Sequence, residues 1–76
     1  MSYSLIEEDG VTRIAGNLAL SNGETIYAEV PVQSGDAVAD YEQILIDRTL
    51  LPLKEYDDQG NEIDLGFTVT SVTQPD

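Results

Sequence analysis

Residues 24–49, ETIYAEVPVQSGDAVADYEQILIDRT, change their hydrophobic period once, at Ser34-Gly35-Asp36. Before that point every second residue is apolar, and a period of two predicts a strand with one apolar face. The apolar positions of this strand are Ile26, Ala28, Val30 and Val32. Because Pro31 has no N–H to donate, we expect the strand to lie at a sheet edge or to bulge there.

After that point residues 36–49 have the period of an amphipathic helix. Its apolar face holds Ala37, Val38, Tyr41, Ile44 and Leu45, and its opposite face holds Asp36, Asp40, Gln43 and Asp47. Ser34 or Asp36 is expected to cap the first turn. Arg48 lies near the edge of the apolar face, where it either extends toward water or pairs with a carboxylate elsewhere.

Toward the N-terminus, two turn motifs delimit two more strands. Asp9-Gly10 is typical of a type I′ hairpin turn and joins residues 2–8 to residues 11–20. Ser21-Asn22-Gly23 is predicted to form a second hairpin loop.

Toward the C-terminus, Pro52 ends any helix at or before Leu51. Residues 50–56 and 61–73 are then expected as strands around a turn at 57–60, and residues 74–76 as a frayed end. In the last strand one face is apolar, with Ile63, Leu65, Phe67 and Val69.

The element order is therefore β-β-β-α-β-β, in one small acidic domain that spans residues 1–76. The simplest α+β packing is an antiparallel sheet of about four to five strands with one amphipathic helix on one face. A curled, partly closed small barrel with the helix as a plug is the competing architecture.

Composition restricts the chemistry. The 76 residues include 15 acids, three bases, and no His, Cys or Trp, for a net charge of −12, while 41% are apolar. The apolar fraction suffices for a folded core. Without His and Cys the usual transition-metal ligands, the usual general base and the thiol nucleophile are missing. We therefore expect a protein that is not an enzyme and that carries no metal or cofactor.

Charge and hydropathy also bear on partners and location. Arg13, Arg48 and Lys54 are too few to neutralise many phosphates, so direct binding to nucleic acid or to an anionic membrane is not expected. No apolar run approaches the roughly 20 residues of a membrane span. Residues 1–4 have no signal-peptide features. We expect a cytoplasmic protein.

The acidic segment 55–62, EYDDQGNE, superficially resembles a calcium-binding loop. With Gly60 at the sixth position of an EF-hand loop, the twelfth would be Gly66, where a bidentate Glu is required. A solvated hairpin turn is the favoured interpretation, because Asp, Asn and Gly are typical turn residues.

The distribution of acids is the most informative feature of the chain. The net charge exceeds the magnitude of about 2–8 that solubility alone suggests for a small domain. Such a surface could mimic a run of phosphates and occupy the basic groove of a nucleic-acid-binding protein, although the acids could equally serve only for solubility. Residues predicted to contact the partner are Asp36, Asp40 and Asp47 as one patch, Asp57, Asp58, Glu62 and Asp64 as a second, and the tyrosines Tyr27 and Tyr56.

In size and charge the chain resembles small acidic proteins carried by phages and mobile elements, which block host enzymes by occupying basic surfaces. That resemblance implies an inhibitor. The alternative is a virion or assembly accessory protein. It would self-associate through a sheet edge formed by the uncharged, β-prone residues 68–73.

Overall fold

The computed structural model describes residues 1–75 and has the predicted α+β order. Its elements are β1 (Ser4–Glu8), β2 (Val11–Leu20), β3 (Thr25–Pro31), the 3₁₀ turn η1 (Val38–Asp40), α1 (Tyr41–Leu50), the 3₁₀ turn η2 (Leu51–Leu53), β4 (Glu55–Tyr56), β5 (Glu62–Ile63) and β6 (Val69–Thr73).

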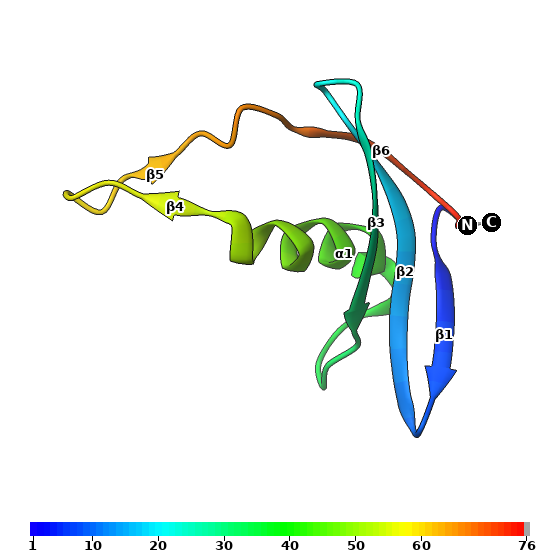
Figure 1. The fold of residues 1–76 in the computed structure, drawn as a ribbon. Coiled ribbons are helices and arrows are strands. Elements are labelled where there is room, and N and C mark those ends of the chain that lie inside the picture. The colour runs from blue at the N-terminus through cyan, green and yellow to red at the C-terminus, as the bar shows by residue number, and fades with distance from the viewer. Residues whose placement is uncertain (76) are drawn as a thin grey trace.

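The long strand β2 organises a four-stranded antiparallel sheet. Along one side it pairs with β3, and along the other it pairs first with β1 and then with β6 (Figure 1). The partner of β2 changes from β1 to β6 within two residues, because Ala15 pairs with Ser4 while Asn17 pairs with Thr73. The sheet is therefore open rather than a closed barrel, and β3 is an edge strand, as Pro31 predicted.

Both hairpin turns form where the sequence predicted them. Asp9 and Gly10 have φ angles of 53° and 77°, the positive values that a type I′ turn requires. In the second loop the Asn22 side chain accepts the N–H of Glu24 at 2.9 Å.

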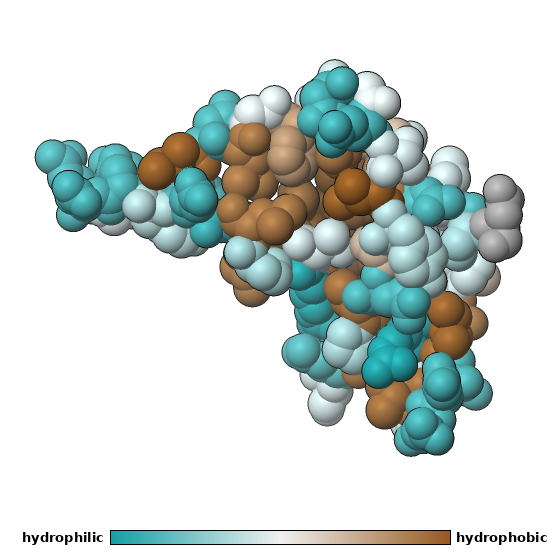
Figure 2. Space-filling model, viewed as in Figure 1, coloured by the Kyte–Doolittle hydropathy of each residue, from teal (hydrophilic) through white to brown (hydrophobic). Residues whose placement is uncertain are grey.

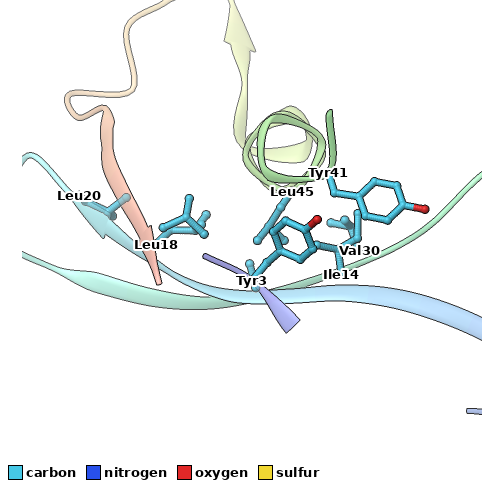
Figure 3. Close-up of a cluster of buried hydrophobic side chains, with 9 residues drawn as sticks. Tyr3, Ile14, Leu18, Leu20, Val30, Tyr41 and Leu45 are labelled. Atoms are coloured by element: carbon cyan, nitrogen blue, oxygen red, sulfur yellow. The ribbon is translucent and has the colours of Figure 1, made fainter. Parts of the chain in front are cut away.

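The core lies between the helix and one face of the sheet, and Leu45 at its centre is fully buried (Figure 3). Tyr41 packs edge-on against Tyr3, with ring centroids 6.0 Å apart. The buried hydrophobic cluster consists of Tyr3, Ile14, Leu18, Leu20, Ala28, Val30, Tyr41, Leu45 and Val72. Gly16 lies beneath Leu45, and this close approach brings helix and sheet together.

The helix begins later than predicted. Residues 38–40 form a 3₁₀ turn, α1 starts at Tyr41, and neither Ser34 nor Asp36 caps it. The Asp36 carboxylate has other partners, since it accepts the Gln33 N–H at 2.7 Å and binds Arg48. The N-terminal part of the predicted apolar face is consequently exposed, with Val38 at 64%.

The two predicted C-terminal strands are wrong in extent. Residues 51–53 continue as a 3₁₀ turn, so within the predicted strand 50–56 only Glu55 and Tyr56 form a strand. The predicted strand 61–73 is divided into β5 and β6, because Gly66 adopts a φ of 84° and the Asp64 carboxylate accepts its N–H at 2.8 Å. Each half then pairs with a different strand, β5 with β4 and β6 with β2.

Near the end of the described chain, the Gln74 side chain donates to the Tyr3 carbonyl at 3.1 Å. This contact lies in the segment 74–76 that the sequence suggested would fray, and Asp76 is outside the described residues.

The β4–β5 hairpin projects from the body (Figure 1). The radius of gyration is 13.6 Å, against about 11.4 Å for a compact chain of this length. We call residues 54–64, the hairpin with its base, the arm.

Candidate acidic interface

The arm carries the densest group of charges in the described chain. It holds one cation, Lys54, and five carboxylates. These carboxylates belong to Glu55, Asp57, Asp58, Glu62 and Asp64. Every residue from 51 to 64 is exposed, so all five carboxylates are accessible to a partner.

Asp57 shapes the tip of the arm. One of its carboxylate oxygens accepts the N–H groups of Gln59 at 2.9 Å and Asn61 at 2.8 Å. The Asp57 carbonyl also accepts the Gly60 N–H at 3.0 Å. The hydrogen bonds to the carboxylate, that of the Asn61 N–H first, lower the pKa of the Asp57 carboxyl and favour its charged form. The predicted hairpin turn at residues 57–60 is confirmed, since β4 and β5 pair on either side of it.

At the base of the arm, Lys54 Nζ lies 3.2 Å from the Glu62 carboxylate and joins the two strands. Both side chains are exposed, so this ion pair contributes little to stability. The arm is therefore a short hairpin held by local hydrogen bonds, of a kind that is only marginally stable by itself.

The five carboxylates of the arm lie within 11 residues of sequence, on the paired strands β4 and β5 and on the segments next to them.

The predicted patch of Asp36, Asp40 and Asp47 presents fewer free charges than predicted, because Asp36 is paired. Arg48 binds both carboxylate oxygens of Asp36, at 2.6 and 2.7 Å, and donates to the Pro31 carbonyl at 3.2 Å. The Arg48 hydrogen bonds lower the pKa of the Asp36 carboxyl. Because the Asp36 side chain is only 10% exposed and its charge is neutralised, it fastens the loop after β3 to α1 rather than facing a partner.

Two acids of that patch remain on the surface. Asp40 ends η1 and Asp47 lies on α1, and both are exposed. The Gln43 amide donates to Asp47 at 2.8 Å and fixes its orientation.

The two candidate tyrosines lie on different surfaces. Tyr56 is 59% exposed on the arm. Tyr27, at 53%, lies on the sheet face opposite the helix, where its hydroxyl donates to Glu29 at 2.8 Å. That hydrogen bond raises the pKa of Tyr27. The structure therefore groups Tyr56, but not Tyr27, with the acidic arm.

A hollow at the base of the arm was not predicted. It has a volume of about 310 Å³ and lies between the end of α1 and the chain leaving β5. Its lining consists of Leu50, Lys54, Glu62, Ile63, Asp64, Leu65 and Phe67. The alternation of apolar residues at 63, 65 and 67 indicated one shared face, but not that part of this face would stay open to solvent.

No family model, curated protein or solved structure matches this chain. Among residues 1–75 no helix has the length and apolar character needed to cross a membrane. The same residues contain no cluster of three or more acidic, His or Cys side chains arranged to hold a metal ion.

Proposed function

We propose that the protein is a non-enzymatic binding module that inserts its acidic arm into the basic groove of a nucleic-acid-binding protein and inhibits it by mimicking phosphate charge. One observation carries this proposal. Five exposed carboxylates lie on a projecting hairpin whose single cation is already paired.

Two further features support this function. A protruding hairpin can reach into a concave site that a flat surface cannot enter (Figure 1). The excess of negative charge would steer encounter with a basic partner and make association depend on salt. We place the protein in the cytoplasm, as expected for an inhibitor of the phage type.

The test begins with the immobilised chain and a cell lysate at low salt. Captured proteins are eluted by a salt step and assayed for binding to nucleic acid, with and without the free chain. The proposal requires an eluted nucleic-acid-binding protein for which the chain and the nucleic acid compete.

Three double variants, each removing two negative charges, then locate the contact. They are E55Q/D58N on the arm, D40N/D47N on the helix and E7Q/E8Q at the β1–β2 turn. Only E55Q/D58N should weaken competition, chiefly by slowing association. Equal effects of all three would show that net charge rather than the arm is recognised, and would overturn the proposal.

The second candidate function is assembly through a sheet edge. In the described part of the chain β6 pairs only with β2, and its residues 69–73 carry no charge. Such an edge can add a strand from another chain. Sedimentation at rising concentration separates the two functions, because a salt-insensitive oligomer supports assembly and a persistent monomer supports the inhibitor.

A further inference from the structure

The base of the arm exposes apolar surface next to the acidic hairpin. Leu51, Leu53 and Ile63 are 61%, 48% and 43% exposed. Figure 2 shows apolar surface gathered between the acidic hairpin and the body. A partner that was bound only through the acidic tip of the arm would not contact this apolar surface.

Of these three exposed residues Ile63 lines the hollow of about 310 Å³, which has apolar walls and a charged rim. Leu50, Leu65 and Phe67 are half-buried in its wall, while Ile63 is exposed. The rim carries Glu62 and Asp64, opposed only by Lys54, so it is negative overall. An occupant is therefore expected to place an apolar side chain inside and a cation outside.

We infer that this hollow binds an apolar side chain from a basic amphipathic segment of the partner protein, whose neighbouring Lys or Arg side chains lie against Glu62 and Asp64. The inference rests on the proposed function and adds the anchor that charge alone does not supply. Buried apolar anchors give most of the affinity and residence time of an interface, whereas rim charges mainly set the rate of association.

The hollow can be altered without opening the core. Phe67 packs against the buried cluster, but Ile63 and Leu65 do not belong to it or to the residues packed against it. The test variant is I63S/L65S. Its control is L5S, because Leu5 is 46% exposed on β1, close to the 43% of Ile63, and does not line the hollow.

The probes are two peptides of about 14 residues, a length near which isolated helices begin to form. One is an amphipathic Lys/Leu peptide, and the other has the same lysines with every leucine replaced by serine. Burial of one leucine predicts at least about tenfold tighter binding of the Lys/Leu peptide to the wild type. I63S/L65S should lose most of that preference and L5S should keep it.

Methyl and aromatic NMR of the wild type gives a second measurement that does not depend on how the variants fold. The Lys/Leu peptide should shift resonances of Leu50, Leu65 and Phe67 more than those of Leu5. Equal affinities of the two peptides, or a preference that survives I63S/L65S, would overturn the inference while leaving the acidic arm in place. If E55Q/D58N and added salt left both affinities unchanged, the proposed function itself would fail.

Discussion

The contact between Gly16 and Leu45 gives the sharpest test of the fold. A Cβ atom at position 16 would lie 2.9 Å from Leu45 Cδ2, 3.2 Å from Val72 Cγ1 and 3.3 Å from the Thr73 carbonyl oxygen. Carbon atoms pack best at about 3.5–4.0 Å, so Gly16→Ala must move its neighbours. Leu45 has no exposed surface, and its displacement must shift α1 or its own rotamer.

The expected cost follows from two opposing terms. Overpacking costs about 1–3 kcal/mol, and replacing a strand glycine regains about 0.5–1 kcal/mol. We therefore expect Gly16→Ala to lower the free energy of unfolding by up to about 2.5 kcal/mol. Each kcal/mol corresponds to about 4–8 °C in Tm for a domain of this size.

A double-mutant cycle separates steric conflict from a general loss of stability. Leu45→Ala alone should cost about 2–5 kcal/mol. In the G16A/L45A variant the new methyl group occupies space that Leu45 has left, so the combined cost should be smaller than the two single costs together. Urea denaturation followed by circular dichroism measures all four free energies.

Ala15 provides the matched control, because neighbouring strand residues point to opposite faces and Ala15 therefore points away from α1. Ala15→Gly should not couple to Leu45→Ala. If Gly16→Ala proved more stable than the wild type, or if its effect and that of Leu45→Ala added within about 0.3–0.5 kcal/mol, this packing of Gly16 against Leu45 would be refuted.

Three further predictions concern the segments that hold the arm and the helix in place. Arg48→Met should lower Tm at neutral pH. Because the pKa of Asp36 is lowered in the folded state, the ion pair stabilises the fold above the usual Asp pKa, and this stabilisation is lost as pH falls through the folded pKa. The Tm values of wild type and variant should therefore converge in acid, and a difference that stayed constant with pH would contradict the ion pair. Gly66→Ala should lower the free energy of unfolding by about 1–2 kcal/mol, because a φ of 84° is strained for a residue with a Cβ. No other atom lies within 4 Å of a Cβ placed at position 66, so the backbone conformation alone accounts for this cost. An unchanged Tm would contradict the positive φ. In hydrogen exchange, the amides of the arm should lose protection before those of β2, because every residue from 51 to 64 is exposed. Equal protection of the two segments would show that the arm opens only when the whole domain unfolds.

Local sequence signals predicted the local structure well. Asp9-Gly10 and Ser21-Asn22-Gly23 required backbone conformations that few other residues adopt, and both turns formed. The change from period two to the helical period set the element order, and Tyr41 and Leu45 are buried as the helical pattern predicted. These features depend on residues close in sequence.

The wrong predictions occur where a contact with a residue farther away in the sequence outweighs the local signal. A helix cap at Asp36 was reasonable locally, but a bidentate bond to Arg48 satisfies the same carboxylate, and the partner lies 12 residues away. Likewise residues 61–73 have continuous strand character, yet β4 and β2 each pair with one end, and no local rule divides one apolar row between two sheets.

The candidate site was predicted in composition but not in shape. Counting acids found Asp57, Asp58, Glu62 and Asp64, because charge density is visible in sequence. The sequence did not reveal that Asp36 is neutralised, that Tyr27 lies on a different surface or that an apolar hollow adjoins the acids, because each depends on where the arm leaves the body. That departure is set by Pro52 within η2 and by the turn at Gly66. The two elements that broke the predicted strands thus hold the carboxylates clear of the sheet, and a continuous strand 61–73 would have kept them beside it.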